Sequence, residues 1–333
     1  MADTAIDLTM RFDMRLPPFA TTSFADQYRA CLAMSRWAED QGFARIMLSE
    51  HHGDPAGYLS APLTLAAAIL AATSRIEVVI AALLVPLHDP VRLAEQIATI
   101  DCLAPGRLAI VVGAGYRKAE FEMAQLPRGT RGRLVEDTVA LWRKAWTGEP
   151  FEWQGRALLV TPPPATPGGP NIMIGGKSEP AARRAARLRL PFYPANAEQA
   201  LREAYFDECG KIGFAGSIEG QLPGRARPGF LMVSRDPEAV WRAIGEHALY
   251  DAATYRAWQD DKVHSSWVIE DSSNLESIRA SGNYVVVTPE ECRAMAEASM
   301  GLTLHPLMGG IDPALAWESL RLIETEVLPH LRR

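Results

Sequence analysis

The chain has 333 residues, 48% of them hydrophobic, and a formal net charge of −6 at pH 7. This composition is typical of a globular protein with enough sequence for a large core, and the absence of a domain-wide excess of Lys and Arg argues against nucleic-acid binding. The longest apolar stretches, 59–72 and 76–87, are too short for a membrane-spanning helix, and no signal peptide is evident, so we expect a cytoplasmic protein without a membrane partner.

Short β-rich runs alternate with longer amphipathic stretches, which is the pattern of parallel strands joined by crossover helices. Turn signals mark several boundaries: Gly42 ends the first helical stretch, Asp89-Pro90 begins the third, and Pro105-Gly106 ends it. The first half is predicted to contain strands at 7–14, 44–50, 77–85 and 108–112, and helices at 24–40, 62–73, 90–104 and 131–146.

The second half continues this alternation, after a short β excursion at 151–160 and a Pro-rich loop at 162–170. The stretch 251–285 fits neither a strand nor a clean helix, and long irregular connections inside a domain are usually lids or disordered. Strands are predicted at 172–174, 190–193, 230–233 and 302–307, and helices at 179–188, 197–212, from 237 onward, and at 313–328.

Eight such βα units favour an α/β fold of the (β/α)8 TIM-barrel class, with an insertion or lid around 251–285. We expect the whole chain, 1–333, to form a single domain. An open doubly wound sheet with an appended domain is the alternative.

The active site of a (β/α)8 barrel lies at the carboxyl ends of its strands, so polar residues that end apolar strands are candidates for chemistry. Glu50, His51 and His52 follow the apolar run 46–48. An imidazole there can transfer protons near neutral pH. A metal shared by the two histidines is disfavoured, because adjacent residues of a strand point to opposite faces. The alternative is that an imidazole only bonds to a neighbouring loop.

Gly113 and Gly115 follow the fourth predicted strand. They allow close backbone approach to a ligand, or simply a tight turn. Lys118 occupies the position where the dinucleotide fingerprint requires its third glycine, so a Rossmann site is not predicted.

Gly176, Lys177 and Ser178 lie between the fifth predicted strand and the following helix. Backbone N–H groups at a helix start, together with a lysine and a hydroxyl, suit a phosphate group. The alternative is a tight turn with a solvated lysine. Asn171 takes the place of the first Walker A glycine, which argues against nucleoside triphosphate hydrolysis.

The four cysteines lie far apart and form no CxxC pair. This spacing favours buried, reduced thiols over a disulfide framework or a zinc site. We therefore expect no metal ligands.

Several longer motifs carry a family resemblance. They are SEHHG at 49–53, SAPLTLAAAILAATSRIEV at 60–78, LLVPLHDPVRLAEQIATIDCLAPGRLAIVVGAGYRKAEF at 83–121, IMIGGKSEPAARRAARL at 172–188 and DPALAWESLRLIETEVLPHL at 312–331. Together they resemble the bacterial-luciferase-like flavin-dependent monooxygenases and oxidoreductases across nearly the whole chain.

The resemblance implies a flavin at the strand ends and frequent dimers. It makes His51 the catalytic candidate that handles the proton of a flavin–oxygen adduct. It also implies a cis peptide between Ala81 and Ala82 beneath the flavin ring, and a phosphate site at the glycine-lysine-serine turn. The implied cofactor-binding residues are Glu50, Ala81, Ala82, Gly113, Gly115, Gly176, Lys177 and Ser178.

The chain departs from luciferase at Gly113 and Ala114, where luciferase has Cys and Arg. One phosphate-binding arginine is therefore missing, and Lys177 or Arg117 would have to replace it. The usual Gly-Gly-Ser-Ser sequence also reads Gly-Gly-Lys-Ser here.

These features predict a monooxygenase that receives reduced FMN from a flavin reductase, acts with O2 on a small organic substrate, and forms a homodimer. Tyr255, Trp258, His264 and Trp267 would help to shape the substrate side. The alternatives are an F420-dependent oxidoreductase on the same fold, a flavin-binding or partner-binding protein without turnover, and a metal-dependent barrel hydrolase.

Overall fold

The structure is a computed structural model, and it describes residues 6–220, 227–259, 268–269 and 271–331. Contacts divide the chain into two compact units, each described by itself below. The first comprises Met1–Met47, Asp54–Leu59 and Leu222–Arg333, and the second comprises Leu48–Gly53 and Ser60–Gln221.

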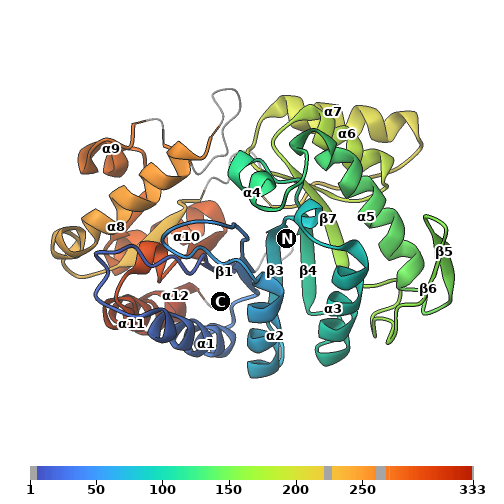
Figure 1. Ribbon diagram of the computed structural model, residues 1–333. Coiled ribbons are helices and arrows are strands. Elements are labelled where there is room, and N and C mark those ends of the chain that lie inside the picture. The colour runs from blue at the N-terminus through green and yellow to red at the C-terminus, as the bar shows by residue number, and fades with distance from the viewer. Residues whose placement is uncertain (1–5, 221–226, 260–267, 270, 332–333) are drawn as a thin grey trace. The chain divides into compact units, whose positions relative to one another are not determined.

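Parallel strands alternate with helices along the chain in both units (Figure 1). The predicted α/β fold of the TIM-barrel class is therefore confirmed. That the chain is a single domain stays a prediction. No helix in the described part of the chain is both long and apolar enough to cross a membrane.

The first unit contains two sets of paired parallel strands. β1 pairs with β11 in a register that sets Met10 opposite Leu304, and β9 pairs with β10 with Phe230 opposite Tyr284. Its elements are β1 (Asp7–Phe12), α1 (Phe24–Asp40), β2 (Arg45–Leu48, whose last residue belongs to the second unit), β9 (Phe230–Val233), α8 (Pro237–Ala257), α9 (Leu275–Ala280), β10 (Tyr284–Val287), α10 (Pro289–Ser299), β11 (Gly301–Leu304), α11 (Pro313–Leu322) and α12 (Leu328–Leu331).

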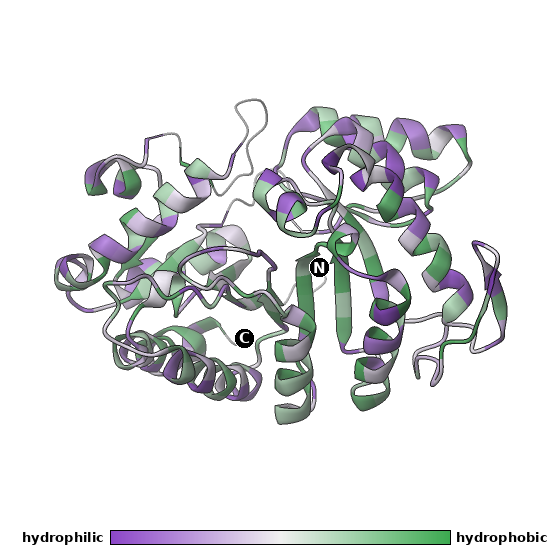
Figure 2. Cartoon of the chain, in the orientation of Figure 1, coloured by the Kyte–Doolittle hydropathy of each residue, from purple (hydrophilic) through white to green (hydrophobic). Residues whose placement is uncertain are grey.

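The second unit is built on a parallel sheet in the order β3-β4-β7-β8. Every residue of β4 is buried, and Figure 2 shows hydrophobic residues along β3 and β4, as strands covered on both faces require. Its elements are α2 (Pro62–Ala72), β3 (Glu77–Leu83), α3 (Pro90–Leu103), β4 (Leu108–Val112), α4 (Lys118–Met123), α5 (Arg131–Ala145), β5 (Phe151–Trp153), β6 (Arg156–Leu158), β7 (Asn171–Gly176), α6 (Glu179–Arg187), β8 (Phe192–Pro194) and α7 (Gln199–Lys211).

The stretch 251–285 is more regular than the sequence indicates. Helix α8 continues to Ala257, helix α9 spans Leu275–Ala280, and strand β10 begins at Tyr284. The expectation of a stretch without clean helix or strand is therefore wrong for these residues. His264 and Trp267 lie outside the described residues.

Candidate functional site

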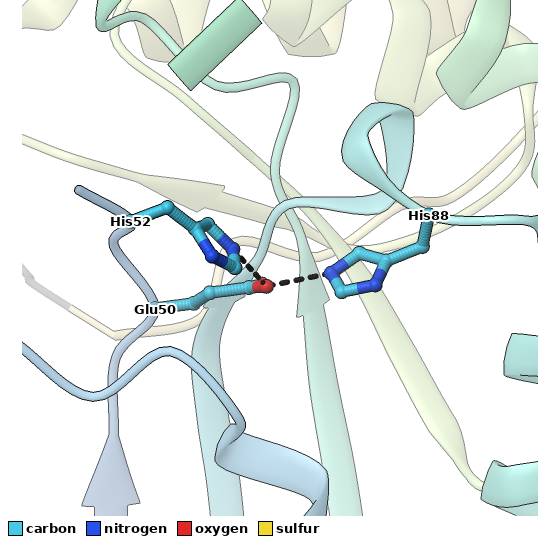
Figure 3. Close-up of side chains that lie close together, drawn as sticks. All are labelled: Glu50, His52 and His88. Carbon is cyan, nitrogen blue, oxygen red and sulfur yellow. Dashed lines mark hydrogen bonds and ion pairs between the residues drawn. The ribbon is translucent and has the colours of Figure 1, made fainter. Parts of the chain in front are cut away.

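The carboxylate of Glu50, just after strand β2, accepts three hydrogen bonds within the second unit. Its Oε1 lies 2.8 Å from His52 Nε2 and 2.6 Å from His88 Nε2 (Figure 3). Its Oε2 accepts the Leu84 N–H at 2.6 Å. Glu50 is only 1% exposed. His88, which precedes the cap of helix α3, was not identified from the sequence.

Burial raises the pKa of Glu50, but the hydrogen bonds from His52, His88 and the Leu84 N–H outweigh it and lower this pKa to about 2. Glu50 is therefore ionised at neutral pH, and an ionised carboxylate only accepts hydrogen bonds. Both facing Nε2 atoms must then carry a proton. The hydrogen bond to Glu50 also raises the pKa of His52.

His51 pairs with a different carboxylate. Its Nδ1 lies 2.8 Å from Oε1 of Glu120, a fully buried residue on helix α4. The same Oε1 accepts the backbone N–H of His52 at 3.1 Å and the guanidinium of Arg117 at 3.3 Å. Glu120 Oε2 is buried and has no hydrogen-bond partner among the described residues.

This arrangement fixes the tautomer of His51. A backbone N–H and a guanidinium can only donate, so Glu120 Oε1 is an acceptor and the nearby His51 Nδ1 must be the donor. In neutral His51 the other nitrogen, Nε2, then carries the lone pair that can take up a proton. An imidazole with one nitrogen bonded to a buried carboxylate is a common form of general base.

An aromatic side chain connects His51 to the predicted phosphate-binding turn. The ring of Tyr116 meets the ring of His51 edge-on, with centroids 5.5 Å apart. Lys177 Nζ lies 4.7 Å from the centroid of the same tyrosine ring, within cation–π range. His51 and Lys177 therefore contact the same aromatic ring.

Small residues lie together at the ends of β3, β4 and β7. The peptide between Ala81 and Ala82 is cis, as the family resemblance implies. A Cβ added at Gly113 would lie 2.8 Å from Cβ of Ala82, and one at Gly175 would lie 3.9 Å from it. Gly115 adopts a φ of +71°, a conformation that favours glycine.

The predicted phosphate-binding residues occupy the junction of strand β7 and helix α6. Gly176 ends the strand, and Ser178 is the N-cap residue, whose side chain makes no capping hydrogen bond. Arg117, one of two candidates for the missing arginine, instead donates to the His52 carbonyl at 2.8 Å and to Glu120. Lys177 belongs to the predicted phosphate-binding turn itself and stays a candidate.

Two of the predicted aromatic residues, Tyr255 and Trp258, lie in the first unit, and Tyr255 lies over a buried arginine. Arg15 pairs with Asp13 at 2.7 Å and with Asp251, and its guanidinium lies 4.7 Å from the ring centroid of Tyr255. The ring of Trp258 lies 5.7 Å from that of Tyr255. The other two residues expected to shape the substrate side, His264 and Trp267, lie outside the described residues.

Comparison with known proteins identifies a single family. Residues 10–299 match the family described as luciferase-like monooxygenase. Among curated relatives, the alkanal monooxygenase alpha chain of Photorhabdus laumondii is 26% identical over 180 residues, which is 53% of this chain and 49% of that protein. The first curated relatives are likewise matched over only 40 to 55% of their own length.

Solved structures of similar fold cover nearly the whole chain. Monooxygenase RslO1 from Streptomyces bottropensis has a TM-score of 0.76 at 20% identity, covering 97% of this chain and 99% of its own. The oxygenating constituent of 3,6-diketocamphane monooxygenase from Pseudomonas putida, in complex with FMN, has a TM-score of 0.71 at 20% identity and covers 98% of each chain. An F420-dependent secondary alcohol dehydrogenase has a TM-score of 0.64 at 15% identity, covering 93% of this chain and 98% of its own. At these identities the likeness shows the fold alone.

Proposed function

Because the chain belongs to the luciferase-like monooxygenase family, we propose that it uses reduced FMN and O2 to oxidise a small organic substrate. A separate flavin reductase would supply the reduced FMN. The observation that carries this proposal is the hydrogen bond from His51 Nδ1 to the buried Glu120, which prepares His51 for proton transfer.

The second unit has residues that fit a flavin. Alanines and glycines at the ends of β3, β4 and β7 leave backbone and small side chains where a planar ring would pack. Ser178 and Lys177 stand at the start of helix α6, where backbone N–H groups favour a phosphate. When bound, the reduced flavin supplies the electrons that activate O2.

The chain's own residues supply proton transfer and positioning. His51 would accept a proton at Nε2, and the adjacent carboxylate of Glu120 would stabilise the resulting imidazolium. Glu120 also holds the backbone N–H of His52 at 3.1 Å, which fixes the chain direction after strand β2. Lys177 and Ser178 would bind the phosphate and so orient the cofactor.

Replacing His51 with Ala tests the role of this side chain. We expect a loss of turnover on the order of 10²-fold or more, as is typical of general acid–base residues, with FMN affinity close to that of the wild type. The assay couples the protein to a generic NADH-dependent flavin reductase and offers aldehydes and cyclic ketones, the substrate types named for two relatives above. A His330→Ala variant, at an exposed position on α12, is the matched control. Unchanged turnover in His51→Ala would remove this residue from the mechanism.

The F420-dependent alternative keeps the same site. It is favoured by the fold likeness to an F420-dependent dehydrogenase, and it would replace oxygenation with hydride transfer to or from the deazaflavin. Titrating the protein with FMN and with F420, followed by visible absorption, separates the two. Micromolar binding of F420 without binding of FMN would reverse our choice.

A further inference from the structure

We propose that Glu50, His52 and His88 form a binding site for a divalent transition-metal cation, distinct from the proton-transfer pair of His51 and Glu120. One possible ligand atom from each of the three residues lies within 4.8 Å of the other two. Both imidazole Nε2 atoms point at the same carboxylate oxygen, Glu50 Oε1 (Figure 3).

The donor set matches the chemistry of such cations. Two imidazole nitrogens and one carboxylate oxygen form a recurrent ligand set for Zn²⁺ and Fe²⁺, with further positions open to water or another ligand. A cation binds the lone pair of a neutral imidazole, so it would replace the two Nε2 protons that face Glu50, and each neutral ring would carry its proton on Nδ1 instead. In a tetrahedral zinc site with bonds of about 2.0–2.1 Å, ligand atoms lie roughly 3.3 Å apart. The observed nitrogen–oxygen distances are 2.8 and 2.6 Å, so each imidazole nitrogen would need to move away from the carboxylate oxygen by about 0.5 to 0.7 Å to reach this spacing.

The surroundings hold one ligand firmly and leave the others accessible. The Leu84 N–H binds Glu50 Oε2 at 2.6 Å, which leaves Oε1 directed at the two rings. The Glu50 side chain is fully buried, whereas those of His52 and His88 are 19% and 28% exposed. A cation can therefore reach the site and retain water ligands on the side of the histidines.

His51 is not part of this ligand set. Its Nδ1 bonds to the carboxylate of Glu120 at 2.8 Å, and not to that of Glu50. A cation at Glu50 would instead link the segment after strand β2 to the turn before helix α3, which carries His88. The competing interpretation is a carboxylate and two imidazoles joined only by hydrogen bonds.

Calorimetric titration with Zn²⁺ decides between these interpretations. The full chain, with any affinity tag removed and after dialysis against a chelator, should bind one equivalent of Zn²⁺ with micromolar or tighter affinity. His88→Ala should weaken binding by about tenfold or more, equal to about 1.4 kcal/mol or more, whereas the exposed control His330→Ala should bind as the wild type does. The catalytic variant His51→Ala should also keep the site.

A second measurement keeps the proposal testable if His88→Ala does not fold. Cobalt(II) bound to the wild-type chain should give the intense visible absorption of a low-coordinate site with nitrogen ligands, and equimolar Zn²⁺ should displace it. Millimolar binding, a spectrum like that of the aqueous ion, or folded His88→Ala with unchanged affinity would mean an adventitious ion only, and each would overturn the proposal. Because no flavin or substrate is needed, these results do not depend on the function proposed above.

Discussion

Replacing Glu120 with Gln removes a buried negative charge next to His51 while keeping an oxygen that can accept hydrogen bonds. The carboxylate and the imidazole are in contact at 2.8 Å, and neither side chain is more than 9% exposed. Two unit charges about 4 Å apart are worth roughly 4 kcal/mol at an effective dielectric constant of 20. Arg117 would keep its positive charge nearby, which further disfavours a protonated His51.

Allowing for relaxation of the site, we expect Glu120→Gln to lose about 3 kcal/mol of stabilisation of the imidazolium. This corresponds to a loss on the order of a hundredfold in a rate limited by proton uptake at His51. The flavin reductase assay should show the loss in kcat, with the Kd for FMN nearly unchanged. The pH profile should also change, because the group that takes up the proton has lost its charged neighbour.

Glu122→Gln is the matched control. Glu122 lies on the same helix, its side chain is 61% exposed, and it pairs with Lys118 at 3.1 Å. Its substitution should leave kcat unchanged. Wild-type kcat and pH profile in Glu120→Gln, or an equal loss in both variants, would refute the assignment of Glu120 as the residue that positions and charges His51.

Three further predictions concern stability. Gly113→Ala places a Cβ 2.8 Å from that of Ala82 and should lower the free energy of unfolding in urea by about 1–3 kcal/mol. The control Gly129→Ala, whose added Cβ would have no atom within 4 Å, should leave this free energy unchanged. Burial lowers the pKa of His305 from 6.5 to about 4. As the pH falls, this histidine therefore takes up its proton at a higher pH in the unfolded chain than in the folded one. The free energy of unfolding should fall by about 3 kcal/mol between pH 6.5 and pH 4. His305→Asn should flatten that part of the pH dependence, and a slope as steep as in the wild type would contradict the assignment. Arg107→Met should lower the free energy of unfolding by about 3 kcal/mol in the same assay, because this arginine donates to backbone carbonyls at the end of α2 and before β3. An unchanged urea midpoint would show that these hydrogen bonds are dispensable.

The sequence predicts those parts of the fold that depend on local signals. Asp89-Pro90 and Asp312-Pro313 mark the starts of helices α3 and α11, where each aspartate caps backbone N–H groups. Strand β10 was missed, because its run of four residues follows a stretch without a clear period. A strand this short is defined by its partner, β9, and not by its own pattern.

Local sequence signals do not identify Glu120, the carboxylate partner of His51. Glu120 lies 69 residues away along the chain, on the six-residue helix α4, and a contact over this separation leaves no local pattern in the sequence. A glutamate on a short helix after a glycine turn has the sequence appearance of a solvated surface residue. Its burial, and the orphaned Oε2, are tertiary features.

The different partners of His51 and His52 agree with the expectation that the two imidazoles do not share one metal ion, whereas nothing in the sequence indicated the contact with His88. Adjacent residues of a strand point to opposite faces, so the sequence disfavours one ion shared by His51 and His52, and in the structure their side chains bond to different carboxylates. The same alternation places Glu50 and His52, two residues apart, on one side. That pair, joined by His88 from the turn after β3, is the cluster we propose to bind a cation, although the sequence led us to expect no metal ligands. His51 thus bonds to Glu120, whereas His52 and His88 bond to Glu50, which is why the effects of His51→Ala and His88→Ala should be separable.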